Sequence, residues 1–176
     1  MYHRFGENKY PSTNIREEQL VSHLEYLKDQ GFNFILARDL LFEDKLQKKT
    51  ISITVDDAYL SFFEVGLPIF EKYEIPVTLF LNTENVGGQN YMNWTQLKSV
   101  LSRGVDIQNH THSHSSLSSL SEIEIVNEIE KSQDLIFENL GITPNLFAYP
   151  FGENSTIAQK VAVSYTHLTL PTTVDV

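Results

Sequence analysis

The chain has 176 residues, a length that suits one domain with a sizeable hydrophobic core. With 13 Lys and Arg against 23 Asp and Glu, its formal net charge is −10, which argues against non-specific nucleic-acid binding but not against a cation site. The lack of cysteine excludes disulfides, thiol nucleophiles and cysteine-type zinc sites, so a metal site must use histidine and carboxylate. The sequence shows no apolar run of membrane-spanning length and no signal peptide at its start, so we assign no cellular location.

The first half of the chain alternates short apolar runs with amphipathic segments. Leu20, Leu24 and Leu27 share one helical face and Gly31 follows, which predicts a helix over roughly 16–30. The elements predicted next, in chain order, are a strand at 32–36, a short helix at 39–46, a β-branched strand at 51–55 and a helix at 59–73 that restarts at Pro68.

The second half continues the alternation. Its predicted elements, in chain order, are a strand at 77–81, a helix from Trp94 to Gly104, a strand at 105–109, a helix at 121–140 and a strand at 146–149. Ser121 and Glu124 form a capping box at the start of the long helix, and Gly141 ends it. This order predicts βα units and a parallel sheet. A closed eight-unit barrel usually needs about 250 residues, so we expect an open sheet or an incomplete barrel.

The adjacent carboxylates Asp56 and Asp57 come directly after the strand at 51–55. In parallel α/β folds the active site lies at the carboxyl ends of the strands. One carboxylate of such a pair could bind a cation while the other accepts a proton. The alternative is an ordinary turn, in which Asp is common because of its local hydrogen bonds.

Three of the six histidines fall within five residues, at positions 110, 112 and 114, where another predicted strand ends. If the chain turns helically there, His110 and His114 lie on one side and His112 points away. Two imidazoles at this spacing chelate a divalent metal, and an Asp with two His is a frequent ligand set for Zn²⁺. The alternative is a solvated polar loop.

The segment Tyr149-Pro150-Phe151-Gly152 follows the last predicted strand. Pro and Gly around an aromatic residue favour a tight backbone that could aim an N–H group at a developing oxyanion. An ordinary strand-ending turn is the alternative. His3 is a further candidate for lining the site, with a surface position as its alternative.

Together these motifs resemble the polysaccharide deacetylases, the NodB-homology domain of carbohydrate esterase family 4. Residues 54–59 (TVDDAY) resemble the family motif Thr-Phe-Asp-Asp-Gly-Tyr, and residues 110–114 (HTHSH) resemble His-Thr/Ser-x-x-His. Residues 148–152 (AYPFG) resemble Arg-x-Pro-Tyr-Gly, and Tyr2-His3 is similar to a Tyr-His stretch in one branch. The resemblance covers about residues 2–160 and implies a distorted, incomplete (β/α) barrel.

The resemblance also implies site roles. Asp57, His110 and His114 would bind one divalent metal, with Zn expected and Co, Ni or Mn as alternatives. Asp56 would be the general base for the attacking water. The backbone N–H of Phe151 would help to stabilise the oxyanion. The candidates for substrate binding are Tyr59, Tyr149 and Pro150.

Three departures from the family pattern qualify these expectations. Ala58 replaces the usual Gly, and Ala148 stands where many members carry an Arg that orients the base. The later motif Leu-x-x-His, whose His acts as general acid, has no counterpart after Gly152. From Val163 the sequence resembles a translated sequencing-adapter string, so His167 is not assigned as that acid. We therefore predict a domain over 1–160, shortened at both ends, and an irregular, non-native tail over 161–176.

The resemblance implies metal-dependent hydrolysis of the N-acetyl amide of sugars in a polysaccharide, with release of acetate. The expected partner is an N-acetylated glycan and not a nucleic acid. Because the general acid is missing, this chain is expected to be inactive. The alternative is a non-catalytic glycan-binding or scaffold relative that keeps the metal site. The sequence does not identify the polysaccharide or the oligomeric state.

Overall fold

The computed structural model describes residues 1–42, 48–153, 155–165 and 168–170. Its centre is a sheet of five parallel strands whose spatial order follows the chain order. The strands are β5 (Ile53–Asp56), β6 (Val77–Leu81), β7 (Asp106–Asn109), β8 (Leu146–Ala148) and β9 (Leu168–Leu170). Tyr2 forms one further parallel bridge, with Val55 at the outer edge of β5. The sheet curls into a half-barrel, which confirms the predicted incomplete (β/α) barrel.

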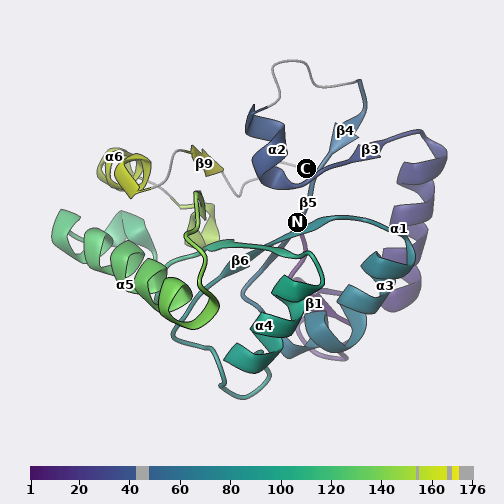
Figure 1. The fold of residues 1–176 in the computed structure, drawn as a ribbon, viewed down its shortest axis with the longest axis horizontal. Helices are drawn as coiled ribbons and strands as arrows, with labels where there is room; N and C mark the ends of the chain where they lie inside the picture. Colours follow the sequence, from purple (N-terminus) through teal and green to yellow (C-terminus); the bar gives the residue numbers. More distant parts are fainter. Residues whose placement is uncertain (43–47, 154, 166–167, 171–176) are drawn as a thin grey trace.

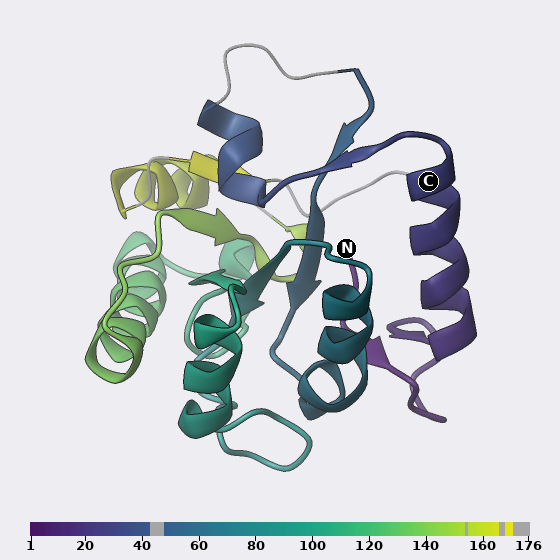
Figure 2. The same ribbon diagram turned by 45° about the vertical axis from the view of Figure 1, so that its right-hand side comes forward.

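Helices surround the outer side of this curled sheet (Figures 1 and 2). They are α1 (Glu17–Asp29), α3 (Leu67–Lys72), α4 (Trp94–Ser102), α5 (Glu122–Leu140) and α6 (Thr156–Tyr165). None of the helices in the described part of the chain is long and apolar enough to span a bilayer. The helix α1 precedes the central sheet, and each of α3, α4, α5 and α6 connects one parallel strand to the next, as in a singly wound βα succession.

Two small parallel sheets flank the central one. β1 (Arg4–Phe5) pairs with β2 (Asn14–Ile15), and β3 (Asn33–Phe34) pairs with β4 (Thr50–Ile51). The strand predicted at 51–55 is therefore divided between β4 and β5, which belong to different sheets. The short helix predicted at 39–46 is α2 (Ala37–Phe42), and residues 43–46 lie outside the described part.

The helix predicted at 59–73 begins as a π-helical segment, Phe62–Gly66, and continues as α3. Pro68 is the second residue of α3, at the point where the π-helical segment passes into the α-helix. The predicted ends of α5 are also confirmed. Ser121 and Glu124 form the capping box, and Gly141 adopts the left-handed conformation (φ 71°) that ends the helix.

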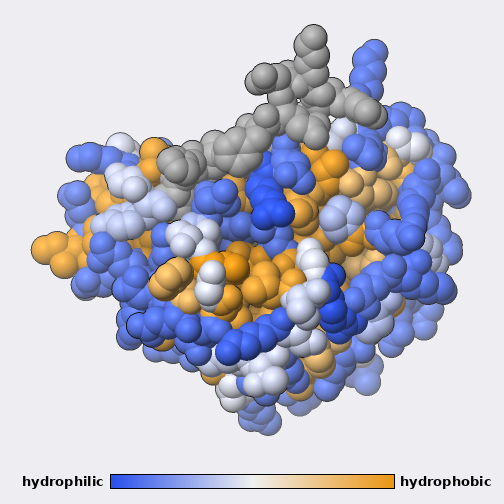
Figure 3. All heavy atoms as spheres, viewed as in Figure 1, coloured by the Kyte–Doolittle hydropathy of each residue, from blue (hydrophilic) through white to orange (hydrophobic). Residues whose placement is uncertain are grey.

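Two apolar clusters hold the helices against the sheet. In the larger one, Phe5, Phe62 and Phe70 are in mutual ring contact at the base of α3, and they pack with β5, β6 and α4. In the smaller one, Ile125 and Ile129 of α5 pack with β8 and α6. On the face seen in Figure 3, apolar residues gather toward the middle and hydrophilic residues lie around most of the outline.

The expectation of irregular structure from about Val163 is wrong for the described residues of this segment. α6 continues through Tyr165, whose hydroxyl donates to Glu130 Oε1 at 2.7 Å, and β9 pairs in parallel with β8. An apolar stripe on α6 crosses residue 160, where the predicted domain ends, and it was not recognised in the sequence. The residues of this stripe are Ala158, Val161, Ala162 and Tyr165. The assigned domain limits and the non-native origin of the tail stay predictions, and His167 lies outside the described residues.

The contact between Gly66 and the ring of Phe5 gives a stability prediction. A Cβ at position 66 would lie 2.9–3.0 Å from ring carbons of Phe5, a fully buried side chain. We expect Gly66→Ala to lower the free energy of unfolding by about 1–3 kcal/mol, the usual cost of overpacking. Chemical denaturation measures this change. Phe5→Leu should be less harmful in the Gly66→Ala background than in the wild type, and additive effects would contradict the proposed clash.

Candidate metal centre

The carboxyl ends of β5, β6, β7 and β8 form one edge of the sheet. Asp56 is in register with Phe80, Leu81 with Asn109, and Asn109 with Phe147. The residues that follow these four strands therefore emerge at the same edge of the sheet. They are Asp57 after β5, Asn82 after β6, His110 after β7 and Tyr149 after β8.

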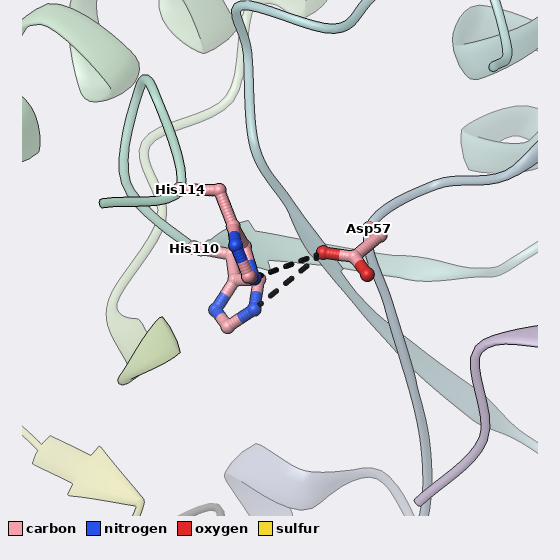
Figure 4. A group of neighbouring side chains, drawn as sticks. All are labelled: Asp57, His110 and His114. Atoms are coloured by element: carbon pink, nitrogen blue, oxygen red, sulfur yellow. Dashed lines mark ion pairs between the residues drawn. The ribbon is translucent and has the colours of Figure 1, made fainter. Parts of the chain in front are cut away.

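Asp57, His110 and His114 converge at this edge (Figure 4). Asp57 Oδ1 lies 3.8 Å from His110 Nε2 and 3.2 Å from His114 Nε2, and one ligand atom from each residue lies within 4.8 Å of the others. Asp57 and His110 are buried, and His114 is half-buried. A carboxylate and two imidazoles at these separations suit Zn²⁺ or a similar ion with a coordination position left for another ligand.

A hydrogen bond to the backbone fixes the tautomer of His110. Its Nδ1 lies 2.8 Å from the carbonyl oxygen of Ala148, a bond in which Nδ1–H must donate. Nε2 is therefore the nitrogen with a free lone pair, and it faces Asp57. Burial lowers the pKa of His110 to about 4, although the charge of Asp57 acts in the opposite direction. The imidazole is neutral at physiological pH, as a metal ligand must be.

The segment from His110 to His114 is a loop and not the helical turn considered in the sequence analysis. Thr111 and His114 have φ angles of 70° and 59°, and the loop closes when Thr111 Oγ1 accepts the N–H of His114 at 3.1 Å. His112 points away from the triad, as expected, and its Nδ1 lies 2.9 Å from Thr83 Oγ1. The pairing of the two metal-facing histidines thus depends on loop geometry and not on helical periodicity.

Asp56 lies beside the triad in a different environment. Its side chain is 2% exposed, and Oδ1 has no hydrogen-bond partner within the described part of the protein. Burial and, secondarily, the negative charge of Asp57 raise the pKa of Asp56 to about 8. Asp57 and Ala58 then have φ angles of 72° and 56°, and this left-handed pair turns the chain away from the sheet. The family's Gly would fit position 58 without that backbone cost.

A cavity of about 590 Å³ opens over these groups. Among the residues predicted for the site, those that line it besides the triad and Asp56 are His3, Tyr59, Tyr149 and Phe151. Pro150 is buried and is not among the lining residues in the described part of the chain. It lies instead at the start of the short 3₁₀ turn Pro150–Gly152 beneath the cavity.

The structure adds residues that the sequence analysis did not single out. Asn82 Nδ2 donates to Asp57 Oδ1 at 2.8 Å, and Asn85 Nδ2 donates to Asn82 Oδ1 at 2.9 Å. This chain of amides orients the carboxylate that both imidazoles face. Asn82 could have been found, because it directly follows the apolar strand at 77–81, just as Asp56 and Asp57 follow theirs. No sequence signal marked Asn85.

Tyr59 and Tyr91 form an aromatic wall of the cavity. Their ring centroids are 4.7 Å apart, and the guanidinium carbon of Arg4 lies 3.4 Å from the Tyr59 centroid. Burial and a hydrogen bond with Tyr91 raise the pKa of Tyr59, so its hydroxyl stays protonated at physiological pH. A rigid ring backed by a cation offers an apolar face with a polar tip to a ligand in the cavity.

Phe151 lies at the opposite side of the triad. It has a φ angle of 59° inside the Pro150–Gly152 turn, and its ring stands edge-on to His114 at 4.7 Å between centroids. The next two N–H groups donate to Tyr149 and Pro150 carbonyls. Among the described residues, the structure gives no acceptor for the Phe151 N–H itself. That N–H is available to a ligand.

The comparisons with known proteins identify the family of this chain. Residues 43–169 match the family model described as polysaccharide deacetylase, and the chain belongs to this family. A poly-beta-1,6-N-acetyl-D-glucosamine N-deacetylase of Staphylococcus aureus is 28% identical over 173 residues, covering 86% of this chain and 60% of that protein. The chain thus spans about 60% of the length of this curated relative.

Two solved structures share the fold. The deacetylase PplD of Streptococcus pyogenes, in complex with acetate, has a TM-score of 0.85 at 24% identity, and IcaB from Ammonifex degensii has 0.83 at 23%. Each alignment covers 94% of this chain and 78% of the other chain. At these identities the likeness shows the fold alone.

The environment of His110 gives a prediction for NMR. In the metal-free protein we expect the ring of His110 to titrate with a pKa of about 4, because burial disfavours the imidazolium form. Below that pH the ring gains a proton. Asp57→Asn should lower the pKa further, because it removes the negative charge that favours the proton. Chemical-shift titration of the histidine rings measures both values, and a His110 pKa near 6.5 would contradict the described burial.

Proposed function

We propose that this protein is a metal-dependent deacetylase that hydrolyses the N-acetyl amide of N-acetylated sugars in a polysaccharide and releases acetate. The observation that carries the proposal is the convergence of Asp57, His110 and His114 beside the buried Asp56, whose Oδ1 has no hydrogen-bond partner among the described residues. Membership of the polysaccharide deacetylase family supports the same reaction class. The names of the Staphylococcus aureus relatives support an N-acetylglucosamine polymer as the substrate class.

Asp57, His110 and His114 would hold the metal, for which Zn²⁺ is the expected ion and Co²⁺, Ni²⁺ or Mn²⁺ are alternatives. The donor set fits, because neutral His110 presents Nε2 and the Asn82 amide fixes the Asp57 carboxylate. A divalent cation held there would polarise the amide carbonyl, lower the pKa of a neighbouring water and offset the negative charges of the two aspartates.

Asp56 is the proposed general base. Its carboxylate reaches the cavity from the strand end, and Oδ1 has no competing donor among the described residues. A base must come within hydrogen-bond distance of the water that it deprotonates, about 2.6–3.2 Å. The orphaned oxygen is suited to accept that proton, and the low-polarity surroundings that raise its pKa also raise its basicity.

Phe151 and the cavity walls complete the proposed site. The backbone N–H of Phe151 would donate to the oxyanion that develops on the amide carbonyl, which is the role a preorganised, unpaired donor performs best. Tyr59 and Tyr149, which line the cavity, would contact the sugar. His3 also lines the cavity, and Pro150 begins the turn that contains Phe151. The general acid for the leaving amine stays unassigned within the described residues.

The metal proposal is tested by ligand substitution. We expect Asp57→Ala and His114→Ala to weaken Zn²⁺ binding by more than about 100-fold, since residues that only support ligands already contribute roughly 10–100-fold. Isothermal titration calorimetry of the metal-free protein measures the affinity. Asp134→Ala, on the exposed side of α5, is the matched control and should bind like the wild type. Unchanged affinity in the Asp57 and His114 variants would overturn the metal site.

The proposed role of Asp56 as a base is tested by comparing Zn²⁺ binding with acetate release. We expect Asp56→Asn to keep Zn²⁺ affinity. In a homologue that also contains the general acid, the same substitution should lower acetate release by about 10²–10⁴-fold, the usual contribution of a general base. The assay measures acetate from N-acetylglucosamine oligomers, with Asp134→Asn as the control. Loss of metal binding in Asp56→Asn would show that Asp56 is a ligand. Metal and glycan binding without acetate release by the wild type would favour the non-catalytic alternative.

A further inference from the structure

One carboxylate outside the proposed active site holds the loop that carries His114. Glu128 of α5 accepts hydrogen bonds from two consecutive backbone N–H groups, those of His112 at 3.0 Å and Ser113 at 2.7 Å, both through Oε2. Its other oxygen, Oε1, accepts the hydroxyl of Ser113 at 2.8 Å. Glu128 thus bonds to the two residues that immediately precede His114 and not to the imidazole itself.

The loop needs this support because of its own backbone. Thr111 and His114 both adopt the left-handed region, where a residue with a Cβ costs roughly 1–3 kcal/mol. Two successive N–H groups that point to one side form a concave anion site, and a carboxylate there makes charge-assisted bonds of about twice the usual strength. Without the Glu128 side chain, these two N–H groups would lose the acceptor that the structure gives them, and the strained loop would lose this restraint.

Glu128 is itself held in place by the helix that carries it. The neighbouring Ile129 is fully buried, as is Ile125 one turn earlier. The side-chain amide of Asn109, the last residue of β7, donates to the carbonyl oxygen of Ile129 at 3.1 Å. The helix register is therefore fixed relative to the strand end from which His110 projects, and Glu128 transmits that position to His114.

We propose that Glu128 is a positioning residue for the metal centre, which sets the metal affinity by holding His114 in the binding geometry. This inference rests on the proposed metal site. The inference goes beyond that site, because it assigns part of the metal affinity to a side chain that contacts neither the side chain of a metal ligand nor the substrate. The geometry of the hydrogen bonds, and not the negative charge alone, carries the effect. A glutamine could reproduce it, since its carbonyl oxygen accepts both N–H groups and its amide donates to Ser113 Oγ.

The test measures metal binding without any activity assay. Co²⁺ is titrated into the metal-free protein and followed by visible absorption, with a chelator as competitor, for the wild type, Glu128→Ala, Glu128→Gln and Glu138→Ala. Glu138 is an exposed glutamate on the same helix and controls for the change in charge. We expect Glu128→Ala to bind Co²⁺ roughly 10–100-fold more weakly. Glu128→Gln should keep most of the affinity, and Glu138→Ala should match the wild type.

The outcomes separate this inference from the proposed function. Co²⁺ binding by Glu128→Ala equal to that of Glu138→Ala overturns the role of Glu128 and leaves the metal site intact. No Co²⁺ binding by the wild type overturns both. Denaturation of each metal-free variant identifies a purely structural role, which lowers stability but leaves the affinity of the folded protein unchanged. If Glu128→Ala does not fold, Ser113→Ala must weaken Co²⁺ binding for the inference to stand, with Ser115→Ala as its control. Ser113→Ala removes the bond to Glu128 Oε1 and the hydroxyl bond to Ser115, and Ser115→Ala removes only the latter of these two.

Discussion

The parallel register of four strands is the constraint from which the candidate site follows. Because β5 to β8 pair in chain order, the residues after each strand emerge at one edge, and hydrogen bonds join them there. His110 Nδ1–H reaches the carbonyl oxygen of Ala148, its neighbour across β7 and β8, and the Asn82 amide reaches Asp57 across β5 and β6. A shift of one residue in either pairing would turn these side chains to the other face of the sheet.

The charges at this edge explain why the site suits a cation. Two adjacent carboxylates are buried there, and the buried imidazole that faces them, His110, is kept neutral by its own burial. Without a metal, the favoured state places a proton on Asp56, whose raised pKa reflects both desolvation and the charge of Asp57. A divalent ion would supply the missing positive charge and free the carboxylate of Asp56 to act as a base.

Much of this arrangement could be predicted from the sequence, because strand ends and motif residues coincide. Asp57 and His110 directly follow neighbouring strands of the parallel sheet, so the strand pairing brings them to one edge. His114 is different. Its position depends on left-handed residues in a loop and on a carboxylate 14 positions later in the chain, and no local periodicity records either. The helical turn considered for residues 110–114 brings the same two histidines together for a different physical reason, and that predicted geometry is wrong.

The helix near the end of the chain was also difficult to predict from a local sequence pattern. The apolar positions 158, 161, 162 and 165 form a helical stripe, but only a window that crosses residue 160 contains all four. The stripe buries α6 against α5, the helix that also holds the histidine loop through Glu128. Packing that looks remote from the metal centre therefore stabilises the element that orients His114. The helix α5 therefore has two contacts. Its buried face packs in the apolar core, and its residue Glu128 bonds to the loop that carries the candidate ligand His114.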